Sequence, residues 1–234
     1  MRVSVIIPTY NEAQSIGRVL ADIPRIVTEV LVVDSDSSDG TADIAREMGA
    51  EVLREPRRGY GRACLTGLAA VNAADVVVFL DGDYSDRPAE MPSLLEPLSS
   101  GCADMVIGSR LAGARTPGAL PWHAVFGNRL AAFLIGSLSG VYLTDLGPFR
   151  AARYDALMAL GLQESSYGWP VEMIVKGARR GLRIVEVPMS YHPRLGSSKI
   201  SGTLRGSVGA AWGILSAIVK YQFFDCTFAR RGAL

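Results

Sequence analysis

The chain has 234 residues, of which 49% are hydrophobic and 20% charged, a composition that supports a buried core and excludes an intrinsically disordered protein. Its 24 basic and 23 acidic residues leave a net charge of +1, so no overall charge attracts nucleic acid as a partner. The three cysteines are far apart and lack CxxC spacing, which argues against a disulfide scaffold and against a structural zinc site.

Short apolar runs alternate with helical patterns along the first third of the chain. The runs that predict strands lie at residues 3–7, 29–33, 51–53 and 74–80, and helices are predicted from Asn11, over 39–48 and over 60–72. We expect Asn11 to cap the first helix and Glu12 to lie in its first turn. This alternation predicts a mainly parallel sheet with helices on both faces.

Beyond residue 100 the pattern is less regular. It predicts further strands at 103–107 and 183–187 and helices over 125–138, 154–160 and 170–180. No repeat or linker divides the chain into two independent domains.

Polar residues follow three of the predicted strands. Residues 8–12 follow the first, residues 34–39 the second, and Asp81-Gly82-Asp83 the long apolar run at 74–80. Ligands of open α/β sheets bind beyond the carboxyl ends of the strands, so we expect these residues to share one pocket. Gly82 allows a tight turn that brings both carboxylates to one cation, and such hard oxygen ligands suit Mg²⁺ or Mn²⁺ shared with a diphosphate.

Two other polar segments have simpler interpretations. Asp34 can accept hydrogen bonds from a nucleotide ribose or base, whereas Asp39 and Thr41 are interpreted as caps of the next helix. Gly59-Tyr60-Gly61 precedes a helix, but the chain lacks the GxGxxG and GxxxxGK[ST] loops, which disfavours dinucleotide-binding and ATP-loop folds.

Four collinear motifs carry a family resemblance. They are IPTYNE at 7–12, VD at 33–34 with SDGT at 38–41, DGD at 81–83, and EVP at 186–188 with RLGSSK at 194–199. Over residues 3–200 the chain resembles family 2 glycosyltransferases of the GT-A fold, close to the dolichol-phosphate mannose synthase group and its bacterial polyprenyl-phosphate relatives. The fold that this resemblance implies is an α/β, Rossmann-like GT-A fold with a mainly parallel sheet.

The resemblance also implies a role for each matched position. The nucleotide-sugar donor would contact Pro8, Tyr10, Glu12, Asp34, Asp81, Gly82, Asp83, Arg110, Arg194 and Lys199. Asp81 and Asp83 would hold Mg²⁺ or Mn²⁺. Catalysis would use Asp83, Arg110, Asp145 and Lys199, and the acceptor site would contain Arg129, Asp145, Glu172 and Ser197. The chain departs from the family at Ser35, at Ser85 and at Gly147-Pro148, which replace a more usual Asp, Gln and Ser-Gly.

The implied reaction is inverting transfer of a hexose from a donor of the GDP-mannose or UDP-glucose type, with a polyprenyl phosphate as the expected acceptor. A phosphate nucleophile is already an anion and needs no strong base. A sugar-hydroxyl acceptor, the alternative, would use Asp145 as the base, with Glu172 in reserve. The departures from the motifs keep open a catalytically idle, nucleotide-binding scaffold. A nucleotidyltransferase would need a glycine- and lysine-rich loop after the first strand, which this chain lacks.

The carboxyl-terminal segment favours a lipid acceptor. Residues 206–219 carry no charge but are too short to span a bilayer. The helical stripe predicted to lie in the membrane interface is Leu204, Val208, Ala211, Leu215, Ile218 and Val219, flanked by Arg205 and Lys220. A core helix or a dimer-interface helix is the alternative.

We divide the chain into a GT-A domain, residues 1–202, and an amphipathic helical tail, residues 203–234. Within the domain, residues 1–110 would bind the nucleotide sugar and residues 111–202 the acceptor. The amino terminus lacks the features of a secretory signal, so we expect a cytoplasmic protein on the inner face of the membrane. A homodimer or a membrane-protein partner is left open.

Overall fold

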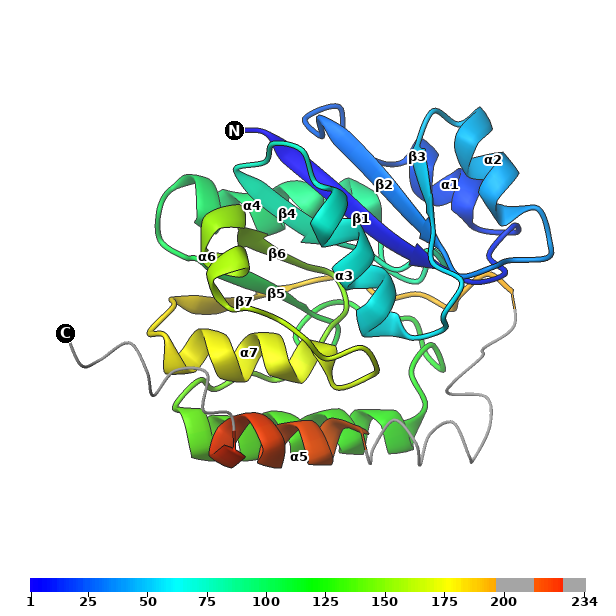
Figure 1. Ribbon diagram of the computed structural model, residues 1–234. Coiled ribbons are helices and arrows are strands. Elements are labelled where there is room, and N and C mark those ends of the chain that lie inside the picture. The colour runs from blue at the N-terminus through cyan, green and yellow to red at the C-terminus, as the bar shows by residue number, and fades with distance from the viewer. Residues whose placement is uncertain (197–212, 225–234) are drawn as a thin grey trace.

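The computed structural model describes residues 1–196 and 213–224 and confirms the expected GT-A architecture of a mainly parallel sheet flanked by helices (Figure 1). In these residues seven strands form one sheet in the order β3-β2-β1-β4-β6-β5-β7. The strands are β1 (Val3–Thr9), β2 (Glu29–Asp34), β3 (Glu51–Arg54), β4 (Val76–Phe79), β5 (Met105–Ser109), β6 (Arg150–Arg153) and β7 (Ile184–Pro188). Only β6 runs antiparallel to its neighbours. The sheet thus joins strands from both predicted parts of the domain.

Helices cover both faces of the sheet because its central strands are apolar on both sides. In β1, Val5 belongs to one core cluster and the next residue, Ile6, to the other, as the alternation of a strand requires. One face is covered by α1 (Ile16–Ala21), α2 (Thr41–Glu47) and α4 (Met91–Ser99), the last preceded by the 3₁₀ helix η1 (Pro88–Glu90). The other is covered by α3 (Tyr60–Ala70), α6 (Tyr154–Ala159) and α7 (Trp169–Arg179).

A further layer lies outside α7. It consists of α5 (Trp122–Ser139) and of a helix over 213–219 that continues as the π-helix η2 (Lys220–Phe224). The two helices lie side by side (Figure 1), and the Gln222 side chain donates a 2.7 Å hydrogen bond to the Leu138 carbonyl. Ala131 and Ile135 of α5 join the same core cluster as α7.

The tail helix combines features of both interpretations of its sequence. Ile218 and Tyr221 are buried in the core, whereas Leu215 and Val219 are 40% and 49% exposed. The tail helix is therefore partly a core helix, with a second apolar face on the outside. Leu204, Val208 and Ala211 lie outside the described residues. Among the helices that the structure describes, none has the length and hydropathy needed to cross a bilayer.

The start of the first helix was predicted wrongly. Helix α1 begins at Ile16, and Asn11 does not cap it: Asn11 has a left-handed φ of 53° and accepts a 2.9 Å hydrogen bond from the Ser38 amide. The chain between β1 and α1 is tied to the loop after β2 and cannot continue as helix. Glu12 consequently lies in this loop and not in the first helical turn.

Strand β6, helix α4 and the short 3₁₀ helix η1 before α4 were not predicted. Strand β6 has the sequence Arg-Ala-Ala-Arg, which lacks β-branched residues, and it forms because β4 and β5 both pair with it. Arg150 of β6 is fully buried and donates hydrogen bonds to the carbonyls of residues 146, 147 and 170. Helix α4 contains Pro92 and Pro97, which obscure its helical pattern.

Candidate active site

A pocket of about 290 Å³ opens at the carboxyl ends of β1, β2 and β4, as the polar strand ends predicted. Its volume is close to the lower end of the range for small-molecule sites, roughly 300–1,000 Å³. The lining residues are Pro8, Thr9, Tyr10, Glu12, Ser35, Arg58, Gly59, Tyr60, Ala63, Asp81, Gly82, Asp83, Tyr167 and Arg194. Seven of the predicted donor-site residues are therefore brought together, although they come from three separate parts of the sequence.

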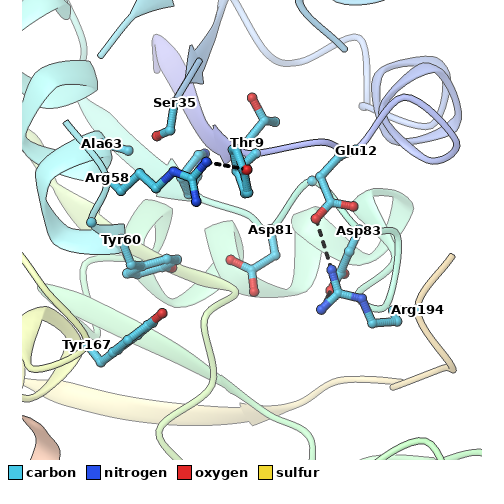
Figure 2. Close-up of a pocket in the computed structure, with 14 residues that line it drawn as sticks. Thr9, Glu12, Ser35, Arg58, Tyr60, Ala63, Asp81, Asp83, Tyr167 and Arg194 are labelled. Carbon is cyan, nitrogen blue, oxygen red and sulfur yellow. Dashed lines mark hydrogen bonds and ion pairs between the residues drawn. The ribbon is translucent and has the colours of Figure 1, made fainter. Parts of the chain in front are cut away.

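Asp81 and Asp83 flank Gly82 in the turn after β4, and both line the pocket. Figure 2 shows the Asp81 carboxylate pointing into the space between Tyr60 and Arg194. Burial and the nearby charge of Asp83 raise the pKa of Asp81 to about 7. Asp83 accepts hydrogen bonds from the Ser85 amide, at 2.9 Å, and from the Ser85 hydroxyl, at 2.6 Å. The departure of the sequence at Ser85 thus has a structural consequence, because this residue orients Asp83.

These carboxylates fit a hard divalent cation. Behind them Asp86 is 1% exposed, and neither of its carboxylate oxygens has a hydrogen-bond partner. Burial raises the pKa of Asp86 well above its usual value. A group of carboxylates with little positive charge around it suits Mg²⁺ or Mn²⁺, because the cation balances the negative charge. In residues 1–196 and 213–224, however, no three His, Cys, Asp or Glu side chains are grouped to hold an ion by themselves.

Arg194 connects the segment after β7 with both acidic loops. Its guanidinium lies 2.9 Å from Glu12 Oε1 and 3.5 Å from Asp83 Oδ2, and Figure 2 shows it beside both carboxylates. The backbone of the same segment is held in place, because the Leu195 amide donates to the Asp83 carbonyl at 3.0 Å. A basic side chain is thereby positioned beside the predicted metal ligands.

Three residues of the opposite wall of the pocket, Arg58, Tyr60 and Tyr167, were missed in the sequence analysis. The Arg58 guanidinium lies 4.0 Å from the centroid of the Tyr10 ring and donates a hydrogen bond to its hydroxyl. Tyr60 and Tyr167 complete this wall. A Cβ atom at Gly61 would lie 2.2 Å from the Glu164 carbonyl oxygen, so glycine is needed here for close approach of two segments. In the sequence, the Gly59-Tyr60-Gly61 spacing was the signal that could have indicated this part of the site.

Asp34 lies at the end of β2 but does not line the pocket. It is 5% exposed and accepts hydrogen bonds from the Ser37 amide, at 2.9 Å, and from the Thr9 hydroxyl, at 3.3 Å. Its neighbour Ser35 faces the pocket instead. Asp34 therefore fixes the loop that presents Ser35.

Arg110 and Asp145 form a buried, two-pronged ion pair. Arg110 Nε lies 2.7 Å from Asp145 Oδ2, its terminal nitrogen 2.8 Å from Oδ1, and its backbone amide 3.0 Å from Oδ2. Burial tends to raise the pKa of Asp145, but the charge and hydrogen bonds of Arg110 outweigh it and hold that pKa below its usual value. Both oxygens of Asp145 are thus used to hold Arg110, an arrangement that differs from a base open to a substrate.

The remaining predicted acceptor residues do not line this pocket. Glu172 of α7 is fully buried, pairs with Lys176 at 2.7 Å and accepts hydrogen bonds from the amides of residues 163 and 164. It could meet an acceptor only if that loop moved. Arg129 is exposed on α5, in the outer layer. Ser197 and Lys199 lie outside the described residues.

Comparison with known proteins agrees with this geometry. Glycosyl transferase family 2 matches residues 4–161 of the chain. The chain is 38% identical, over an alignment of 242 residues, to an undecaprenyl-phosphate mannosyltransferase of Micrococcus luteus. The alignment covers 92% of this chain and 95% of that protein. It is 40% identical over 207 residues to a dolichyl-phosphate hexose transferase of Haloferax volcanii, covering 84% and 86%.

Solved structures agree as well. The structure of glucosyl-3-phosphoglycerate synthase from Mycobacterium tuberculosis, in complex with Mn²⁺, UDP-glucose and phosphoglyceric acid, matches with a TM-score of 0.76 and 26% identity. The match covers 94% of this chain and 79% of that one. With parts of three of its four motifs lining one pocket and its family match over most of the domain, the chain belongs to glycosyl transferase family 2 and has the GT-A fold.

Proposed function

We propose that this glycosyltransferase moves a hexose from a nucleotide-diphosphate sugar to a polyprenyl phosphate at a membrane surface. The observation that carries the proposal is the pocket in which Asp81 and Asp83 lie opposite aromatic side chains and beside Arg194. Two relatives of similar length are named for transfer to undecaprenyl and dolichyl phosphates. A structural relative was solved with Mn²⁺ and UDP-glucose.

In this proposal the donor diphosphate lies near the turn after β4. Asp81 and Asp83 would hold Mg²⁺ or Mn²⁺, which when bound supplies positive charge to the leaving nucleoside diphosphate. Two carboxylates provide only part of the roughly six oxygen ligands that Mg²⁺ prefers, which leaves ligand positions for substrate oxygens. Arg194, already placed beside Asp83, would bind the diphosphate, together with Lys199.

The nucleoside would lie against the wall formed by Tyr10, Arg58 and Ser35. The Arg58 guanidinium lies over the Tyr10 ring, 4.0 Å from its centroid, and such planar groups suit the stacking of a base. Asp34 would act indirectly in this site, through the loop that it fixes.

The ion pairs of the two candidate bases favour a phosphate acceptor. Asp145 is held by Arg110 and Glu172 by Lys176, so neither carboxylate is placed to remove a proton from a sugar hydroxyl. An acceptor phosphate needs no such step. Its oxygen would attack C1 of the hexose while the bond from C1 to the donor diphosphate breaks and its electron pair leaves with the diphosphate. Asp145 would then serve to position Arg110 beside the developing charge.

A transfer assay tests the proposal. Purified protein is incubated with Mn²⁺, radiolabelled GDP-mannose or UDP-glucose, and either a polyprenyl phosphate or an alkyl glycoside, and products are then extracted into organic solvent. We expect labelled sugar on the polyprenyl phosphate and none on the glycoside. Label on the glycoside alone would assign a hydroxyl acceptor. Metal-dependent nucleotide binding without transfer to either acceptor would identify an idle scaffold.

A further inference from the structure

The outer layer formed by α5 and the tail helix exposes an unusual concentration of large apolar side chains. Among the described residues, Trp122, Phe126 and Phe133 of α5 are 80%, 65% and 66% exposed. Leu130 is also exposed, and the four residues recur at helical spacing, which places them on one side of α5. We call these four residues the α5 face. Soluble proteins rarely expose so many large apolar residues together without a binding partner.

The tail helix extends this surface. Leu215, Val219 and Phe223 are 40%, 49% and 64% exposed, while Ile218 and Tyr221 of the same helix are buried. The two helices lie side by side in Figure 1, joined by the hydrogen bond from Gln222 to the Leu138 carbonyl. The exposed apolar residues of both helices are therefore part of one layer.

The charge of this layer is one-sided. From residue 110 to residue 144 the chain has no acidic residue, and neither do residues 213–224. Arg129 lies exposed on α5 between Phe126 and Phe133 in sequence, and Lys220 is 58% exposed although it pairs with Glu164 at 3.3 Å. Aromatic residues next to basic ones, without acids, are typical of helices that lie in the interface of an anionic membrane.

We infer that the α5 face, together with the exposed side of the tail helix, docks this protein on an anionic lipid bilayer. This inference rests on the proposed function, because a lipid-linked acceptor is reached only at a membrane. A symmetric dimer through the same layer would bring the basic side chains of these two helices against those of the second copy and gain no charge complementarity. An anionic lipid headgroup supplies the missing negative charge.

The position of the layer relative to the pocket supports the same occupant. Tyr167 lines the pocket and packs at the start of the tail helix, where a Cβ atom at Gly213 would lie 3.7 Å from the Tyr167 Cβ. Gly168 approaches the tail helix still more closely, because a Cβ there would lie 2.7 Å from that of Ala217. The apolar layer therefore adjoins one wall of the pocket. An acceptor phosphate in the pocket could keep its hydrocarbon chain near a bilayer bound to this layer.

The experiment compares vesicle binding by the full chain and by two double variants. The test variant is Phe126→Ser with Phe133→Ser, and the control is Ile26→Ser with Met48→Ser, which removes two side chains exposed by 50% and 47% elsewhere on the molecule. Binding is measured by co-sedimentation with vesicles of phosphatidylcholine, with and without phosphatidylglycerol. We expect binding to the anionic vesicles that weakens with salt. The test variant should bind at least about tenfold more weakly, because serine buries less apolar surface in the bilayer than the phenylalanine it replaces. The control variant should bind normally.

Transfer assays separate this inference from the proposed function. The test variant should lose transfer to vesicle-borne polyprenyl phosphate but keep it with a short, water-soluble isoprenyl phosphate. Vesicle binding by a wild-type protein that transfers to no acceptor would uphold the docking surface and reject the proposed function. Absence of wild-type vesicle binding, or equal binding by the test variant, would overturn the docking surface. So would a dimer that dissociates in the test variant, which would assign the layer to a second copy of the chain.

Discussion

Replacing Asp145 with Asn tests how strongly burial amplifies an ion pair in this fold. The side chains of Arg110 and Asp145 are 11% and 0% exposed. Removing one partner of such a pair costs about 3–5 kcal/mol, because the remaining charge stays buried without compensation. Domains of this kind unfold with a total free energy of about 5–15 kcal/mol, so we expect Asp145→Asn to remove a large share of the stability.

The chain contains a matched pair for comparison. Arg183 binds Asp104 through the same three groups, with its backbone amide at 2.9 Å, Nε at 3.0 Å and a terminal nitrogen at 2.7 Å. The side chains of this pair are 55% and 19% exposed. Exposed ion pairs contribute only about 0–1 kcal/mol, so Asp104→Asn should be nearly neutral.

Urea unfolding of the wild type and both variants, followed by circular dichroism, measures the difference. We expect Asp145→Asn to be less stable than Asp104→Asn by about 2–5 kcal/mol, with unchanged dependence on denaturant. Arg110 lowers the pKa of Asp145 in the folded protein. The stability difference between the wild type and Asp145→Asn should therefore be complete above the pKa of an unfolded Asp, about 4, and should shrink as the pH falls below it. Equal costs for the two variants would refute the argument that burial decides the strength of these pairs.

The same variant distinguishes the two roles of Asp145. If Asp145 positions Arg110, Asp145→Asn should lower kcat/KM while the pH profile of transfer keeps its shape. Disappearance of an acidic limb from that profile would show that Asp145 is the base of the reaction.

Three further predictions concern the site and its supports. Asp83→Asn should abolish the Mn²⁺-dependent rise in melting temperature caused by nucleotide sugars and leave the unliganded protein stable, since Asn can still accept from Ser85; an unchanged rise would remove Asp83 from the metal site. Glu172→Gln should cost about 3–5 kcal/mol in urea unfolding and leave nucleotide affinity intact, because it strips a buried Lys176 of its carboxylate; a selective rise in the acceptor KM would restore the acceptor role. Gly61→Ala should lower the stability and weaken donor binding, both measured by calorimetry, because its Cβ would meet the Glu164 carbonyl. Gly127→Ala, whose Cβ would have no atom within 4 Å, should instead gain about 0.5–1 kcal/mol of stability. Equal behaviour of the two variants would contradict this.

The sequence alone predicted six of the seven described strands and the location of the pocket. Buried parallel strands are apolar on both sides, so β1, β2 and β4 could be recognised as short uninterrupted runs. Carboxylates directly after such runs must lie at one edge of the sheet, which is why Asp81 and Asp83 were placed correctly in the pocket. The local pattern sufficed here because neighbouring parallel strands end at the same edge of the sheet, so the residues that follow them must lie there.

Only the tertiary structure decided which polar groups pair and which segments complete the pocket. Arg110 meets Asp145 from 35 positions away, and Tyr167 reaches the pocket beside Tyr60 after a still longer separation. Strand β6 exists because two neighbours supply its hydrogen bonds, although its own residues favour no strand. Pairing, burial and close approach depend on atoms that are distant in the chain, and their energies arise only once the fold has excluded water and brought those atoms together.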